Sequence, residues 1–213
     1  MDLSFYEFVG DGIGNDDIVQ EVNKRLEEKY KKKFVAKRIG DRFGKDEDDI
    51  AKIYFHPEGM EKFIFSAKYN IETKEYSDDF CYRKVCYEIE NNLSDILKNM
   101  NVESYIRVEM INKNSLNEIM LLEEFINKYP QIGFLAYVVL KDEQDESKIQ
   151  EAFKQLIVPN INAFIFHAMP EEFDIIEKEV SDLEVFRKSM LTRYIKKDPN
   201  IFNKKNGEVT KIK

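Results

Sequence analysis

Histidine and cysteine are scarce in this sequence, with two residues of each among 213. Ser-His-Asp catalysis needs a histidine, and zinc sites draw mainly on histidine and cysteine. His56 and His167 therefore leave little material for either kind of site. The motifs Gly-x-Ser-x-Gly, His-Glu-x-x-His and Cys-x-x-Cys are also absent. Enzymatic activity is the minority interpretation, and we expect no cofactor.

The two cysteines, Cys81 and Cys86, lie in a segment with helical periodicity. A spacing of five residues turns two side chains on a helix about 140° apart, which argues against a mutual disulfide. We expect both thiols to be reduced and half-buried.

Long apolar runs are missing as well. The longest, residues 132–140, has nine residues, whereas a helix that spans a bilayer needs about 20. Residues 1–5 lack the basic and apolar regions of a signal peptide. These features predict a cytoplasmic protein without a transmembrane segment. A cell-envelope lipoprotein whose leader was removed is the alternative.

Positive charge is in deficit, since 33 Lys and Arg residues face 41 Asp and Glu residues for a net charge of -8. Residues 196–213 hold six lysines and two acidic residues, which leaves -12 on residues 1–195. A body that acidic repels a phosphate backbone, so nucleic acid is a poor partner. A basic protein partner is favoured instead. The lysine-rich residues 196–213 are typical of a solvated terminal tail.

Apolar residues are plentiful enough for a packed core, with 43% hydrophobic residues that include 16 Phe and 11 Tyr. Helical spacing over residues 16–30 is followed by strand-like alternation over residues 34–39, 50–56 and 63–69. A second helix over residues 79–100, capped by Ser77 and Asp78, carries an apolar stripe expected to face this sheet. The sequence predicts an α+β fold in which an N-terminal helix and an antiparallel sheet pack on a long helix.

Alternating strands and helices are expected after residue 101. Residues 103–110, 134–140 and 163–168 have strand character, with helices predicted over residues 115–129, 147–157 and 170–194. A strand-to-strand spacing of about 30 residues with a helix between is typical of parallel pairs. We therefore expect a first half over residues 1–101, a second over residues 102–195 that either stands alone or shares its core, and a basic tail over residues 196–213.

One face of the predicted antiparallel sheet is expected to face water. Its side chains, together with two from the next strand if that strand pairs in the same sheet, are Lys52, Tyr54, His56, Lys68, Tyr105 and Arg107. Tyrosine and arginine are favoured anchors of protein interfaces. This face is the leading candidate for a docking surface, and an ordinary solvated face is the alternative.

A rival candidate lies at the end of the strand that His167 closes. Glu171 and Glu172 open the following helix, so a histidine and a carboxylate could meet there and hold a metal. The competing hypothesis is a small metal-dependent hydrolase. A histidine satisfied by local hydrogen bonds is the simpler interpretation.

Glycines recur before the first helix, over residues 10–14. The pattern resembles the glycine turn of isocitrate and isopropylmalate dehydrogenases, which implies a phosphate-cradling turn. Asp16 and Asp17 follow immediately and would repel phosphate. A plain loop is therefore favoured, and a weak calcium loop is a further alternative.

Four segments resemble a module of uncharacterised proteins from Gram-positive bacteria. They are residues 26–35, which include a Leu-Glu-Glu-Lys-Tyr helix end, residues 53–59, residues 63–68 and residues 77–79. The resemblance covers about residues 15–110 and implies a helix, three strands and a long helix. Many such proteins look like small lipoproteins, and similar ones act as immunity proteins to secreted toxins. The leading functional hypothesis is a non-enzymatic binding protein, which could be an immunity-type inhibitor.

Overall fold

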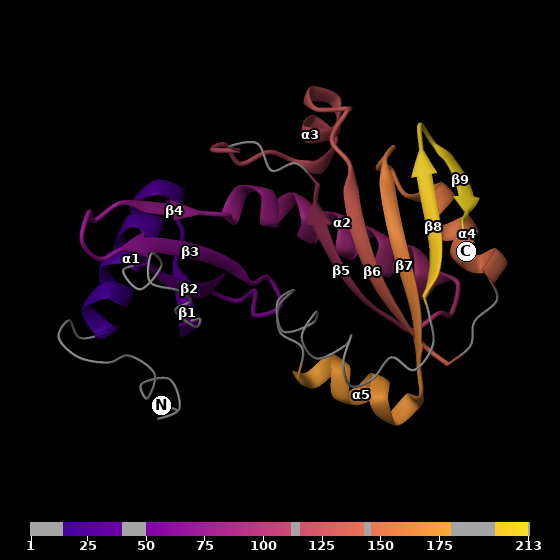
Figure 1. The fold of residues 1–213 in the computed structure, drawn as a ribbon, viewed down its shortest axis with the longest axis horizontal. Helices are drawn as coiled ribbons and strands as arrows, with labels where there is room; N and C mark the ends of the chain where they lie inside the picture. The colour runs from indigo at the N-terminus through magenta and orange to yellow at the C-terminus, as the bar shows by residue number, and fades with distance from the viewer. Residues whose placement is uncertain (1–14, 40–49, 112–115, 143–145, 180–198, 213) are drawn as a thin grey trace. The chain divides into compact units, whose positions relative to one another are not determined.

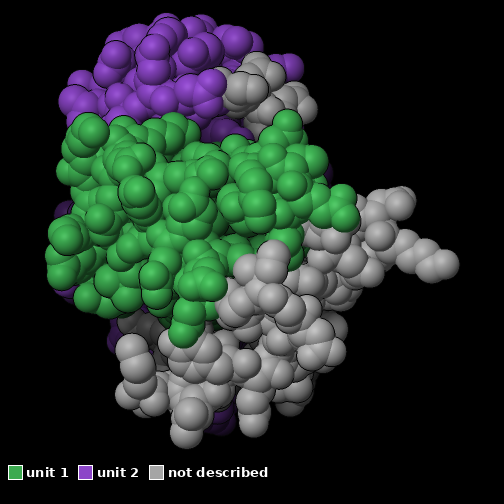
Figure 2. All heavy atoms as spheres, turned by 90° about the vertical axis from the view of Figure 1, so that its left-hand side faces the viewer, with its two compact units in different colours: residues 1–80 green, residues 81–213 purple. Residues whose placement is uncertain are grey.

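The computed structural model describes residues 15–39, 50–111, 116–142, 146–179 and 199–212. The chain divides into two compact units, residues 1–80 and residues 81–213, which Figure 2 colours separately. The first unit contains a sheet of order β1-β2-β3-β4, and the second a sheet of order β5-β6-β7-β8-β9 (Figure 1). The described helices and these two sheets form an α+β protein, as the sequence predicts.

The first unit begins with helix α1 (Asn15–Tyr30), whose first turn carries acidic residues that suit the positive end of the helix dipole. Four strands follow, and each pairs antiparallel with the next. They are β1 (Phe34–Ile39), β2 (Ile50–Pro57), β3 (Phe65–Asn70) and β4 (Tyr76–Asp78). The first three were predicted, whereas β4 was not, because Ser77 and Asp78 look like a helix cap.

Aromatic rings form the centre of the first unit around Phe80, which is 1% exposed. The ring centroids of Tyr30, Phe34, Phe63 and Phe65 lie 4.4–5.4 Å from that of Phe80. Such offset and edge-to-face pairs add about 0.5–1.5 kcal/mol each beyond the burial of their surface. Phe80 therefore links α1 to the buried side of β1 and β3.

A buried carboxylate, Asp78, gives the first unit its main polar contact. Its oxygens accept hydrogen bonds from Lys29 Nζ at 2.8 Å, Tyr30 Oη at 2.6 Å, Tyr76 Oη at 2.5 Å and the Phe80 amide at 3.1 Å. Burial alone would raise the pKa of Asp78, but these side-chain hydrogen bonds and the charge of Lys29 outweigh it and hold the pKa below 3.8. The predicted cap at Asp78 thus exists, and it also ties α1 to β4.

The second unit is built on a mixed sheet with helices on both faces. Its elements after helix α2 (Phe80–Asn99) are β5 (Ser104–Met110), α3 (Leu122–Lys128), β6 (Phe134–Lys141), α4 (Glu146–Gln155), β7 (Ile161–Ala168), α5 (Pro170–Glu179), β8 (Asn200–Lys205) and β9 (Glu208–Lys211). Figure 1 shows α2 and α4 on one face of this sheet and α5 on the other. Separate apolar clusters on the two faces agree with that layering.

The apolar stripe of α2 belongs to the core of the second unit. Val85, Ile89 and Leu93 are fully buried in one cluster with Val138 of β6 and Ala163 of β7. The expectation that this stripe would face the first sheet was wrong. The two compact units divide at residue 80, whereas the sequence predicted a first half that ends at residue 101. Periodicity shows that a helix has an apolar face, but not which sheet receives it.

Strand pairing in the second unit matches the prediction at one pair and differs at another. β6 and β7 are parallel, as expected, whereas β5 and β6 are antiparallel. Helix α3 has seven residues and begins at Leu122, so it is much shorter than the helix predicted over residues 115–129. The chain re-enters the sheet where it left, because the Ile111 amide donates to the Gly133 carbonyl at 2.9 Å. The connection between β5 and β6 therefore returns to the same end of the sheet, as antiparallel strands require, and does not cross over to the opposite end as parallel strands would need.

The C-terminal residues are part of the second sheet, which corrects the prediction of a solvated tail. β8 pairs with β7 and β9 pairs with β8, both antiparallel. The connecting Asn206 and Gly207 have φ angles of 51° and 90°, which is typical of the Asn-Gly hairpin turn. That dipeptide was the missed signal. The part of the predicted last helix that falls on residues 180–194 lies outside the described residues.

Lys204 of β8 shows why a lysine-rich segment need not be solvated. It is 5% exposed, and its Nζ donates to the Lys154 carbonyl at 3.2 Å and to the Leu156 carbonyl. These carbonyls end α4, where the helix dipole favours a cation. Burial lowers the pKa of Lys204.

Cys81 and Cys86 are not joined by a disulfide, and both are buried instead of half-buried. In the part of the chain that the structure describes, no helix has the length and apolar character to cross a membrane.

Replacing Phe202 tests the place of the C-terminal hairpin. Phe202 is 3% exposed in the core of the second unit, so Phe202→Ala should lower the free energy of unfolding by about 3–5 kcal/mol. Ile212→Ala, at a side chain that is 65% exposed, should change it by about 0.5 kcal/mol or less. Urea unfolding followed by circular dichroism measures both. Equal effects of the two variants would mean that residues 199–212 do not pack in solution.

The Asp78 carboxylate should make the first unit sensitive to acid. Because its folded-state pKa lies below its unfolded value, it stabilises the fold above about pH 4, and this contribution is lost as pH falls through the folded pKa. Asp78→Asn should therefore cost about 3 kcal/mol near pH 7, and less as the pH drops below 4. Urea titrations of both proteins across this range measure the difference. Glu72→Gln, at an exposed site, is the control and should show no such pH-dependent gap.

Candidate functional site

The predicted docking residues lie in two different sheets. Lys52, Tyr54 and His56 are on β2 and Lys68 is on β3, all in the first unit. Tyr105 and Arg107 are on β5 in the second sheet, so the prediction that they join the same face was wrong. The cause is that β5 pairs with β6, which follows it in the chain.

The four residues of the first sheet do share one face, and Arg38 of β1 joins them. The register places Arg38 beside Tyr54, Tyr54 beside Ser66, and Lys52 beside Lys68. We call the face formed by Arg38, Lys52, Tyr54, His56 and Lys68 the basic sheet face. It is the side of the sheet opposite to the buried aromatic residues.

Tyr54 lies beneath two cations on this face. The Arg38 Cζ atom is 3.6 Å from the centroid of the Tyr54 ring, and Lys52 Nζ is 4.8 Å from it. Such contacts contribute about 0.5–1 kcal/mol where they are exposed and more where water is excluded. Tyr54 is only 5% exposed, so the prediction of a water-facing ring was wrong. Alternation along a strand predicts on which face of the sheet a side chain lies. It does not predict exposure, because long neighbouring side chains can cover that side chain with their aliphatic parts.

Lysines face each other across the centre of the basic sheet face. Lys52 and Lys68 occupy directly opposite positions on β2 and β3, and Lys68 is exposed. Favourable cross-strand pairs stabilise a sheet by about 0.2–1 kcal/mol each, whereas like charges at directly opposite positions destabilise it.

Local hydrogen bonds hold His56 of this face and also Asp79, which contacts Ser66 opposite Tyr54. His56 is half-buried, and its Nδ1 lies 2.9 Å from the Pro57 carbonyl oxygen. Because a carbonyl only accepts, Nδ1 carries the proton in this contact. The Asp79 carboxylate accepts from the Ser66 amide at 2.6 Å and from Ser66 Oγ at 2.9 Å.

Tyr105 and Arg107 are buried in the second unit instead of forming a water-facing surface. They are 9% and 8% exposed, and the Arg107 Cζ atom lies 4.7 Å from the centroid of the Tyr105 ring. Arg107 Nη1 also lies 3.5 Å from Glu90 Oε2 of α2. Their burial removes these two residues from the candidate docking surface.

Glu90 is the centre of a buried ion cluster that fixes α2 on β5. Glu90 is 4% exposed. Its Oε2 atom accepts a hydrogen bond from Arg83 Nη2 at 2.7 Å, in addition to the contact with Arg107. Its other oxygen accepts the Val108 amide of β5 at 2.8 Å. Three donors therefore compensate the burial of this carboxylate, and one of them belongs to an edge strand.

The residues of the rival metal site are not brought together. His167 Nδ1 lies 3.0 Å from the Asp142 carbonyl oxygen, so it donates to the backbone. Glu172 Oε2 accepts the Met169 amide at 3.4 Å near the start of α5, and Glu171 is exposed. Within the described ranges, no group of three or more His, Cys, Asp and Glu side chains is placed to hold a metal ion. The glycine turn over residues 10–14 lies outside the described residues.

Comparison with known proteins adds a likeness of fold. No protein-family model matches the chain, and no curated protein matches it either. A crystal structure of a DUF5037 family protein from Ruminococcus gnavus is similar, with a TM-score of 0.63 over 90% of this chain and 94% of that one. The two sequences are 12% identical, so the likeness shows a shared fold and nothing about function.

Glu90 should be needed for stability. Glu90→Ala leaves Arg83 and Arg107 without their shared carboxylate and should lower the free energy of unfolding by about 3–5 kcal/mol. Asp95→Ala, at an exposed position of the same helix, should have little effect. Urea unfolding of the two variants gives the comparison. A loss below 1 kcal/mol for Glu90→Ala would contradict a structural role of the cluster.

Proposed function

We propose that this protein is a non-enzymatic binding protein, and that its basic sheet face docks on an acidic protein surface. The observation that carries the proposal is the register that sets Lys52 directly opposite Lys68. Like-charged residues at directly opposite positions of neighbouring strands are unfavourable in the isolated fold. A carboxylate-bearing partner would turn this repulsion into attraction, so the arrangement favours binding of an acidic surface.

The rest of the face supplies features that interfaces use. Arg38 belongs to the residue types that carry most binding energy in protein interfaces. The buried Tyr54 ring beneath Arg38 holds its guanidinium in place, so less freedom of the Arg38 side chain would be lost on docking. At the edge, Val35 of β1 lies beside His56 and is 43% exposed, which adds apolar surface.

Local charge and net charge point to different partners. The net charge of -8 favours a basic partner for the protein as a whole. A docking surface is recognised by the charges on that surface, and four of the five residues of the basic sheet face are basic types. We therefore propose an acidic contact surface on the partner, in place of the basic partner that net charge suggests.

Both histidines fit this non-enzymatic proposal, because each uses one ring nitrogen for a backbone carbonyl contact. An immunity-type inhibitor is one form that the proposed function can take. In that form the partner would be a secreted toxin with an acidic patch, and inhibition would follow from covering that patch.

Charge reversal on the face tests the proposal. The full-length protein is used to capture partners from a lysate of the organism that encodes it, at low salt, beside the variants Lys68→Glu and Lys52→Glu. Each reversal should weaken the captured complex about tenfold or more, which corresponds to about 1.4 kcal/mol. Raising the salt concentration should weaken the wild-type complex, because the contact is charged.

The matched control is Lys154→Glu, which reverses an exposed lysine on α4 in the second unit. It should leave capture unchanged, and thermal unfolding should show that all three variants remain folded. A partner that binds wild type and the two face variants equally well, or one whose binding is insensitive to salt, would contradict docking through this face.

A further inference from the structure

The second unit has an open pocket of about 380 Å³ where α2 ends and β5 begins. Its lining combines polar and charged side chains with the apolar side chains of Val102 and Phe173. The lining residues used below are Ser94, Lys98, Asn101, Glu103, Ser104 and Phe173. The volume falls within the range of about 300–1,000 Å³ that is common for ligand pockets.

A tight turn at the end of α2 brings opposite charges to this pocket. Asn101 has a φ of 57°, and the Val102 amide donates to the Leu97 carbonyl at 2.9 Å, which closes the helix and reverses the chain. Lys98, in the last turn of α2, and Glu103, just before β5, therefore line the same pocket. Both side chains are exposed.

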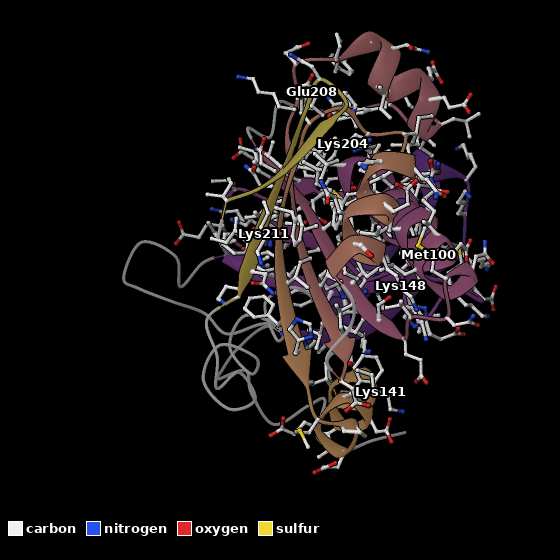
Figure 3. All side chains as sticks on the ribbon, turned by 90° about the vertical axis from the view of Figure 1, so that its right-hand side faces the viewer. Met100, Lys141, Lys148, Lys204, Glu208 and Lys211 are labelled. Carbon is white, nitrogen blue, oxygen red and sulfur yellow. The ribbon has the colours of Figure 1, made fainter. Side chains whose placement is uncertain are left out.

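Lys141 holds the aromatic wall of the pocket in place. Its Nζ lies 3.2 Å from a Glu103 carboxylate oxygen and 3.3 Å from Asp174 Oδ1, and 5.7 Å from the centroid of the Phe173 ring. These contacts connect α5 to the segment that enters β5. Figure 3 shows Lys141 of β6 next to α5. Hydrogen bonds to Glu103 and Asp174 raise the pKa of Lys141, so it stays protonated at neutral pH.

We propose that this pocket binds a small zwitterion, namely a free α-amino acid. The carboxylate of the ligand would pair with Lys98 and accept hydrogen bonds from Ser94 and Asn101. Its ammonium group would pair with Glu103, whose side chain is 69% exposed and can accept more than the bond from Lys141. The side chain of the ligand would pack on Phe173, which favours an apolar amino acid.

Ser104 provides a further reason to expect a polar ligand. Its Oγ is buried and makes no hydrogen bond to the protein. An unsatisfied hydroxyl is unfavourable, and serine can redirect its oxygen by a change of χ1 rotamer. A ligand carboxylate in the pocket would give this hydroxyl a partner.

The pocket and the basic sheet face lie in different units and share no residue. The amino-acid proposal therefore does not rest on the proposed docking function, and either can fail while the other holds.

Titration of the purified full-length protein with the 20 free amino acids tests the proposal. Calorimetry and ligand-observed NMR should show saturable binding of an apolar amino acid. Acetate and methylamine, which each carry one of the two charges, should bind at least tenfold more weakly. Lys98→Ala and Glu103→Gln should each weaken binding of the amino acid about tenfold or more. Lys154→Ala, at an exposed lysine outside the pocket, should bind like wild type.

Ser104→Ala separates binding from folding. It removes a buried hydroxyl that has no partner, so the variant should be at least as thermally stable as wild type while its affinity falls. The proposal would be overturned if no amino acid bound at a ligand concentration of about 10 mM, which corresponds to a very weak affinity. Equal binding of acetate would also overturn it. So would an unchanged affinity of the Lys98→Ala and Glu103→Gln proteins for the amino acid. Thermal unfolding confirms that each variant is folded before its affinity is read.

Discussion

Burial of one helix, α2, is the constraint on which both units depend. Its first residue, Phe80, is the centre of the aromatic cluster of the first unit. The stripe that begins at Val85 belongs to the core of the second unit. The helix runs without a break over its 20 residues, Phe80–Asn99. The division of the chain at residue 80 therefore cuts through the start of a helix and not through a linker.

Local patterns predicted the elements well wherever neighbouring residues decide the structure. The alternation in β2 and β3 and the stripe of α1 depend on spacing along the chain alone, and the sequence contains that spacing. The antiparallel pairing of β5 with β6 depends on where the chain returns after α3, which no periodicity records. The β8–β9 hairpin is an intermediate case. Asn206 and Gly207 are a sequence signal for its turn, but the lysines around them are also typical of a solvated tail.

The candidate site shows the same limit at the level of side chains. Alternation placed Lys52, Tyr54 and Lys68 on one face of the sheet, and the register confirms this. It did not reveal that Tyr54 is covered, because covering depends on Arg38 from another strand. Arg107 looked like a surface anchor, since arginine is usually exposed. Its partner Glu90 lies 17 residues earlier on a helix, and only the fold brings the two together.

Two buried carboxylates in the described part of the chain are matched by hydrogen-bond donors. Asp78 receives four donors and Glu90 receives three, so each carboxylate is compensated where it is removed from water. On the first sheet, the register sets Lys52 and Lys68 at directly opposite positions, where like charges are unfavourable. Local choices that oppose folding are expected where a surface serves a purpose other than folding. The register of Lys52 and Lys68 therefore supports the basic sheet face as a docking surface more strongly than its composition alone does.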